Sequence, residues 1–356
     1  MLTDPRVLSS FLFFFLICTG VMTTAVHAAG KSAKAPAKAS CKVVTVSPGG
    51  VPVDFSAPDS GTKAQVGGIS GVVGQISRGF VAGDAEALAG LFHPRLKMDS
   101  VTMKAELREI RARYGDPVSY TPLKLMILET GGDMAPVACD FEGAMVKPLN
   151  GYDYQASLWL QASGQNEIAR LMLGLVQVSE RLGGGWRIGY LHKQQWTHAG
   201  KDPLSWVEAG RAARDAKHPV AAWTMMDIAE KLLRGSSFVN WMAHDMVIAE
   251  RNAIMGQDKW KKSIAGFVND LKVEDVSSLL AEKGAGVWIK LRLAREVSFN
   301  EIEKNCRQTV KNLTADASAA GLAGAKCSYY RPGEPLEKES FTGGLFVPVS
   351  PPSPAK

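Results

Sequence analysis

Apolar residues recur along this chain with two periods, and the change from one to the other predicts its first domain. From Ile69 they fall at helical spacing as far as Gly83, and two more helices follow, one capped by Asp84 and one over residues 102–114. The pattern then alternates, which predicts strands over residues 123–128, 135–145, 152–161, 168–179 and 186–195. Three helices followed by an antiparallel meander predict an α+β domain over residues 67–198.

Two parts of this domain resemble the nuclear transport factor 2-like superfamily. The first part is the segment Phe80–Leu88, in which Gly-Asp starts a helix that ends at Leu91–Pro94. The second part is the start of the last predicted strand, Gly-Trp186-Arg-Ile. The resemblance implies a curved sheet wrapped around a long helix, giving a cone-shaped pocket. It also implies that an enzyme of this kind would use a desolvated carboxylate or His as a base, beside a donor for the developing oxyanion.

Strand alternation gives the candidate residues of such a pocket. Residues two apart on a strand share a face, so Tyr154, Trp186, Tyr190 and His192 are the candidate ligand-binding residues. Aromatic residues on a sheet face are more often core than ligand contacts. The pattern offers no pair of acid and base, so it assigns no catalytic residue.

A helical segment follows over residues 199–257. Trp206, Gly210 and Ala213 fall on one helix and Ala222, Met226 and Ala229 on the next, a spacing similar to one tetratricopeptide repeat. The resemblance makes Trp206 and Trp223 candidate partner-binding residues. One repeat cannot build a solenoid, so an ordinary helical hairpin packed on the first domain is the alternative. A helix over residues 238–255 would complete a three-helix bundle.

The remaining pattern predicts a small α+β domain of βαβ type over residues 258–340. Helices are expected through Leu271 and around Val276–Leu280, followed by a strand over 287–293, a helix over 299–313 and a strand over 326–330. Residues 341–356 end in a proline-rich run, which predicts open, disordered chain.

The first residues predict export. Residues 1–28 have an apolar block followed by a signal-peptidase-like site at Val26 and Ala28, as in a cleaved signal peptide. Residues 29–66 form an Ala/Pro/Gly-rich linker with one strand near 41–46. We therefore expect a periplasmic or secreted protein with no membrane span after cleavage. Part of the net charge of +6 lies in linker lysines, and nucleic acid is not an expected partner in that compartment.

Four cysteines follow the signal segment, and an even number in an oxidising compartment predicts disulfides. Three pairings are possible on paper. Cys306 with Cys327 is the local choice, which leaves Cys41 with Cys139. No Cys-x-x-Cys motif indicates a zinc site or a redox pair.

Motifs for chemistry are absent from the sequence. No two His residues stand at i and i+4 on a predicted helix, no Gly-x-Ser-x-Gly elbow occurs, and the glycine-rich run Gly183–Gly185 lies between two predicted strands. No metal or cofactor is expected. The leading hypothesis is an exported, non-catalytic envelope protein that binds a protein partner or a small hydrophobic ligand. The alternative is a small-molecule isomerase or lyase that uses the cone pocket.

Overall fold

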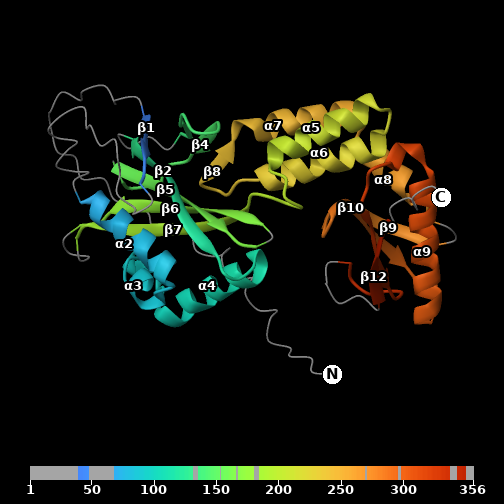
Figure 1. Cartoon of the computed structure of the whole chain (residues 1–356), viewed down its shortest axis with the longest axis horizontal. Helices are drawn as coiled ribbons and strands as arrows, with labels where there is room; N and C mark the ends of the chain where they lie inside the picture. Colours follow the sequence, from blue (N-terminus) through green and yellow to red (C-terminus); the bar gives the residue numbers. More distant parts are fainter. Residues whose placement is uncertain are drawn as a thin grey trace, which may run out of the picture. The chain divides into compact units, whose positions relative to one another are not determined.

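The computed structural model of the chain shows an α+β protein, as the sequence predicts (Figure 1). The structure describes residues 39–47, 68–130, 135–152, 154–165, 167–179, 184–268, 271–295, 298–336 and 343–349. The predicted signal peptide and most of the predicted linker lie outside these residues. Residues 37–356 belong to one compact unit.

Three helices open the described domain: α2 (Ile69–Ala82), α3 (Ala85–Ala89) and α4 (Ser100–Tyr114). Gly83 ends α2 with a φ of 66°, a left-handed conformation that glycine adopts without a Cβ penalty. The carboxylate of Asp84 accepts a hydrogen bond from the amide of Ala87, so the predicted cap is confirmed. The third helix begins at Ser100 because Asp99 caps it through the amide of Thr102.

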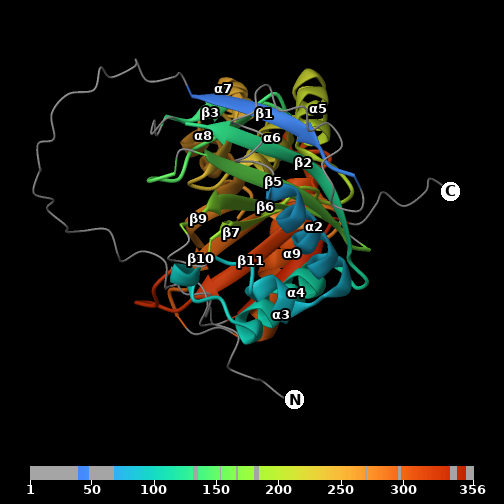
Figure 2. The ribbon, with the colours of Figure 1, turned by 90° about the vertical axis from the view of Figure 1, so that its left-hand side faces the viewer.

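A five-stranded antiparallel sheet follows, in the order β1-β2-β5-β6-β7 (Figure 2). Its strands are β1 (Ser40–Thr45), β2 (Ser119–Glu129), β5 (Tyr154–Ser163), β6 (Ile168–Gln177) and β7 (Trp186–Gln195). The predicted strand near residues 41–46 is confirmed, and as β1 it pairs with β2 at the edge of the sheet. Four predicted strands thus correspond to β2, β5, β6 and β7.

The predicted strand over residues 135–145 is wrong. The chain there forms two short strands, β3 (Val137–Ala138) and β4 (Ala144–Val146), which make a separate three-stranded sheet with β8 (Val239–Trp241). Glu142 and Gly143 have φ values of 51° and 68°, and the amide of Ala144 donates to the carbonyl of Phe141. A tight turn with two left-handed residues reverses the chain where alternation predicted an extended segment.

Both faces of the five-stranded sheet are covered. On one face α2, α3 and α4 pack on buried side chains such as Leu158, Leu173 and Ile188 (Figure 2). On the other face Trp159 and Met172 join a second apolar core that continues through the later helices to the C-terminal sheet. This double burial removes apolar surface from water on both faces and explains why β5 and β6 have few exposed positions.

The helical segment contains α5 (Pro203–Asp215), α6 (Pro219–Leu233) and α7 (Met242–Ile254). α5 and α6 approach closely at Gly210, where an added Cβ would stand 3.0 Å from the Met226 side chain. The absence of a side chain at Gly210 therefore allows the two helices to approach closely. The third helix starts at Met242 rather than at residue 238, because residues 239–241 pair with β4.

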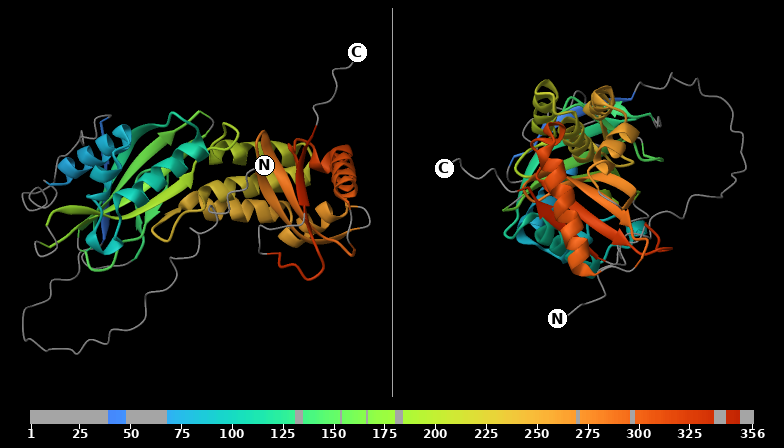
Figure 3. Two further views of the ribbon diagram at one scale, coloured as in Figure 1. Left: turned by 90° about the horizontal axis from the view of Figure 1, so that it is seen from below. Right: turned by 90° about the vertical axis from the view of Figure 1, so that its right-hand side faces the viewer.

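The C-terminal region contains α8 (Gln257–Ala265), β9 (Lys272–Ala281), β10 (Gly284–Arg292), α9 (Phe299–Ala315), β11 (Gly324–Tyr330) and β12 (Gly343–Pro348). β10 and β11 run parallel and α9 connects them, so the predicted βαβ unit is present, with α9 against one face of the sheet (Figure 3).

Two predictions for the C-terminal region are wrong. Val276–Leu280 lies in strand β9, which pairs with β10 in an antiparallel hairpin, and not in a helix. Residues 343–348 of the predicted open tail form edge strand β12 on β11, because Val347 can enter the core from this edge. An apolar run this short fits either conformation until its pairing partner is known.

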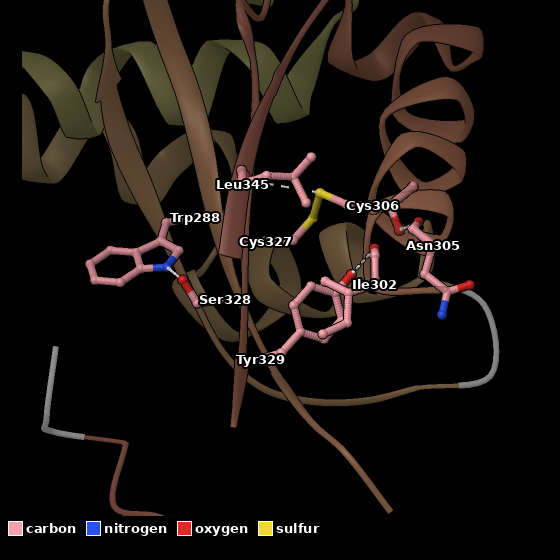
Figure 4. Close-up of a disulfide and its surroundings, with 9 residues drawn as sticks. Trp288, Ile302, Asn305, Cys306, Cys327, Ser328, Tyr329 and Leu345 are labelled. Carbon is pink, nitrogen blue, oxygen red and sulfur yellow. Dashed lines mark hydrogen bonds between the residues drawn. A yellow bond between two sulfur atoms is a disulfide. The ribbon is translucent and has the colours of Figure 1, made fainter. Parts of the chain in front are cut away.

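Two disulfides are formed, one over a long and one over a short sequence separation. Cys41 at the edge strand β1 bonds to Cys139 after β3, with 5.3 Å between the Cα atoms, and Cys306 on α9 bonds to Cys327 on β11, with 5.9 Å (Figure 4). Both predicted pairs, Cys306 with Cys327 and Cys41 with Cys139, are therefore formed. Cys306 and Cys327 are fully buried, so this bond fixes the helix on the sheet from within the core.

We predict that the two disulfides stabilise the protein unequally. The Cys41–Cys139 bond closes a loop with a sequence separation of 98, against 21 for Cys306–Cys327, and a longer loop loses more entropy in the unfolded chain. Removing either bond by double substitution to Ala should lower the free energy of unfolding by about 2–5 kcal/mol, with a loss about 1 kcal/mol larger for C41A/C139A. Urea unfolding of both variants measures this difference, and an equal or reversed order would contradict it.

Candidate functional site

The four candidate ligand-binding residues do not share one face of the sheet. In the register of β6 and β7, Leu175 pairs with Ile188 and Gly174 with Tyr190, so Gly189 is an extra residue that forms a bulge. Trp186 and Tyr154 contact the core beneath α2–α4, as expected. The bulge reverses the alternation after Ile188, so Tyr190 and His192 lie on the opposite face.

Tyr190 and His192 are half-buried on that opposite face. The Tyr190 ring stacks on Phe238 with 4.3 Å between ring centroids, and burial raises the pKa of its phenol to about 12. His192 is paired with Met172 of the second core, its Nε2 is buried without a hydrogen-bond partner among the described residues, and burial lowers its pKa. Neither residue faces Trp186, so the four side chains do not form a common pocket.

The face of the sheet beneath α2–α4 is filled by apolar side chains. Leu158 and Ile188 are fully buried, and Trp186 is 2% exposed. The hydroxyl of Tyr154 donates to Glu129 at 3.4 Å, near the end of both strands. In the described residues this face therefore presents the packing of a core.

Trp206 and Trp223, the candidate partner-binding residues, are core residues. They are 2% and 1% exposed, respectively. The indole of Trp206 donates to the carbonyl of His198, and Trp223 stacks on Trp260 with 4.0 Å between centroids. Each fixes the position of a helix, and neither offers a surface to a partner in this conformation.

A group of charged side chains lies in the interior between α6, α7 and β9. Asp227 and Glu230 of α6 are both buried, and Arg251 of α7 forms ion pairs with both. The hydroxyl of Ser278 on β9 donates to Asp227. Buried carboxylates need such partners, and these contacts join the helices to the C-terminal sheet.

Glu230 contacts three basic side chains, those of Arg234, His244 and Arg251. Burial disfavours its charged form, but hydrogen bonds and charge from Arg234, with the charge of Arg251 and a hydrogen bond from His244, outweigh burial and lower its pKa. The described residues contain no group of three or more His, Cys, Asp or Glu side chains arranged to hold a metal ion. We interpret the group as a structural ion-pair network.

A cleft of about 470 Å³ lies where the five-stranded sheet meets the helices α5 and α7. The sheet contributes Arg170 of β6 and Trp196, which follows β7. The remaining wall comes from α5, the end of α6, α7 and the turn between β3 and β4. Volumes of roughly 300–1,000 Å³ are typical of small-molecule sites.

The cleft is apolar inside and has exposed apolar residues at its rim. Val207 and Val247 are buried within it, whereas Leu204 of α5 and Met246 of α7 are 62% and 69% exposed. Met242, one turn before Met246, is also exposed. Exposed apolar side chains gathered beside a concave surface are typical of binding sites, and methionine adapts to varied ligands.

Charged groups in the cleft are mostly engaged with one another. Arg170 donates to Glu142 at 2.9 Å, and Arg211 makes two hydrogen bonds to Glu250, which lower the pKa of that carboxyl. Asp202 caps α5 through the amide of Ser205. Among the described residues that line the cleft, the charged side chains are therefore held by one another or by a helix cap.

Sequence reasoning missed this cleft. The one available signal was that Leu204 and Met246 are large apolar residues outside the buried stripe of their helices. Their proximity could not be found from the sequence, because α5 and α7 are separated by the whole of α6 and meet the sheet only in the folded chain.

Removing the charge of Glu230 should destabilise the protein in a pH-dependent way. A lowered pKa in the folded state means that the ionised form stabilises the fold above the unfolded value of 4.5, and that this contribution is lost as the pH falls below it. We expect E230Q to reduce the free energy of unfolding by about 2 kcal/mol at pH 7 and by progressively less at acidic pH. Urea unfolding from pH 7 to pH 3 measures this, with the exposed D245N as control; a constant difference across that range would contradict it.

Comparison with known proteins gives no relative from which a function could be transferred. No protein-family model, curated protein or solved structure matches the chain. No helix among the described residues is both long enough and apolar enough to cross a bilayer. The resemblances to the nuclear transport factor 2-like superfamily and to a tetratricopeptide repeat stay predictions, and the function has to be argued from the cleft itself.

Proposed function

We propose that this chain is an exported, non-catalytic binding protein whose ligand or partner segment occupies the cleft between the sheet and the helices α5 and α7. The observation that carries the proposal is the exposed pair Leu204 and Met246 at the rim of an apolar cavity. A water-exposed apolar rim has a free-energy cost that a bound apolar group would relieve.

The rigidity of the walls supports a binding role. The sheet wall is covered on both faces, and the helical wall is fixed by the ion pairs of Arg211 with Glu250 and of Arg251 with Glu230. A preformed cavity loses less conformational freedom when a ligand enters, so more of the interaction energy appears as affinity.

The second candidate, an isomerase or lyase that uses the cone, has weaker support. The three polar candidates Tyr154, Tyr190 and His192 are divided between the two faces of the sheet. General acid–base catalysis needs both groups within reach of one substrate.

Export to the periplasm or the exterior is part of the same proposal. The two disulfides are compatible with an oxidising compartment, where such bonds persist. The predicted signal peptide lies outside the described residues and supports export through its sequence pattern alone.

The proposal predicts that an uncharged hydrophobic fluorophore binds the purified, oxidised chain in this cleft. L204D and M246D should each weaken binding by about tenfold or more, because burying an apolar side chain is worth about 1.5–3 kcal/mol and a carboxylate would have to be desolvated. Fluorescence titration with N-phenyl-1-naphthylamine measures the affinity.

V101D is the matched control, since Val101 on α4 is similarly exposed and far from the cleft in sequence and fold. Equal affinity in all four proteins, or no binding to the wild type, would count against the proposal. Circular dichroism would verify that the variants stay folded.

A further inference from the structure

Arg170 is an unusual side chain for the position it occupies. It extends from β6 on the face of the second core, its side chain is only 8% exposed, and its guanidinium lies 4.7 Å from the centroid of the Trp196 ring. Burial lowers the pKa of Arg170, although the charge of Glu142 acts to raise it. A buried guanidinium keeps its charge, and its N–H groups therefore need acceptors.

One N–H group of Arg170, that of Nε, is buried without an acceptor among the described residues. A guanidinium carries five N–H donors. In the described part of the chain only Nη2 of Arg170 donates, to Glu142, and Nε is buried without a partner. Arg170 lines the cleft, so this unused donor capacity lies at the wall of the proposed binding site.

A second donor group lies at the same cleft. Helix α7 has 13 residues, and its N-cap residue Trp241 supplies no side-chain cap. The amide of Met242 donates to the carbonyl of Gly143, next to Glu142, and Ala243 in the first turn lines the cleft. The first amides of a helix and its dipole favour an anion at this end.

The carboxylates of the cleft do not meet this need. Asp202 is engaged by the amide of Ser205, Glu250 by Arg211 and Arg214, and Glu142 accepts from only one N–H of Arg170. Of the acids that line the cleft, Glu142 and Glu250 are paired with the lining arginines Arg170 and Arg211, while the buried Nε of Arg170 is a hydrogen-bond donor without a partner among the described residues.

We infer that the ligand of the cleft is an amphipathic monocarboxylate, whose carboxylate is bound by Arg170 and the first turn of α7 and whose apolar chain lies along Leu204, Val207 and Met246. This inference rests on the proposed function and names the chemical class of its ligand. Arginine binds planar carboxylates through paired N–H donors, which suits a fatty-acid-like head group.

The test compares three probes that share a twelve-carbon chain: dodecanoate, dodecanol and dodecyltrimethylammonium. Their affinities for the purified, oxidised chain are measured below the concentrations at which they aggregate, by displacement of N-phenyl-1-naphthylamine and by calorimetry. We expect dodecanoate to bind at least about tenfold more tightly than the other two, because only it can accept the charge-assisted hydrogen bonds. Equal affinity of all three probes would overturn the inference and leave the proposed function standing. If none of the probes binds, both the inference and the proposed function are contradicted.

Two variants assign the head-group site. R170M replaces the buried guanidinium with an apolar side chain. It should leave the affinity for dodecanol unchanged and abolish the preference for dodecanoate over dodecanol. R292M is the matched control, because Arg292 on β10 is also largely buried and paired with a carboxylate, that of Glu274, but does not line the cleft, and it should keep the preference.

E142Q tests the same site without removing the guanidinium. It takes away the carboxylate that competes for Arg170, so dodecanoate should bind about threefold or more tightly while dodecanol is unchanged. If R170M does not fold, a failure of E142Q to tighten dodecanoate binding overturns the inference. Tighter binding of a peptide with an apolar, carboxylate-bearing C-terminus than of dodecanoate would also overturn it, because the cleft would then recognise a protein partner.

Discussion

The burial of helix α6 is the constraint on which the second half of the structure depends. Most of its positions are buried, because α5, α7, α8 and the strands β9 and β10 all contact it. Such a helix has almost no solvent-facing stripe, yet it carries Asp227 and Glu230. Their carboxylates are stable there only with Arg251 and Ser278 in place, which fixes α7 and β9 relative to α6.

The five-stranded sheet imposes a second constraint because neither of its faces is left to solvent. One face is the floor of the core beneath α2–α4, and the other joins the core that extends through α6 to the C-terminal sheet. The bulge at Gly189 serves this arrangement, since it directs Trp186 to one core and Tyr190 to the other. Aromatic residues that looked like one ligand-binding group therefore stabilise two different cores.

The cleft follows from how these two constraints meet. β4 and β8 pair and bring the start of α7 next to the turn at Glu142, and Asp202 starts α5 nearby. A cleft remains at this junction, lined by Arg170 and Trp196 and rimmed by exposed apolar side chains. An apolar cavity with the unpartnered Nε of Arg170 on one wall, as the described residues form it, is suited to holding a ligand.

The sequence by itself determined the local elements of this protein. Asp84 and the glycine at position 83 set the boundary between α2 and α3, the alternating segments gave four strands of the meander, and the spacing of the cysteines favoured the pairs that are formed. These features depend on neighbours within a few residues, or on a small number of possible pairings, so a single sequence is sufficient to predict them.

Tertiary structure alone decided the rest. Residues 276–280 and 343–348 became strands because β10 and β11 offered edges to pair with, and Trp206 and Trp223 became core residues because α6 is enclosed. The face of the sheet on which Tyr190 lies was decided by the bulge at Gly189. The bulge reverses which side chains point to which face, and the alternating pattern of the sequence does not reveal it. The cleft, finally, is formed by residues from four distant segments, and contacts of that range depend on packing that no local period encodes.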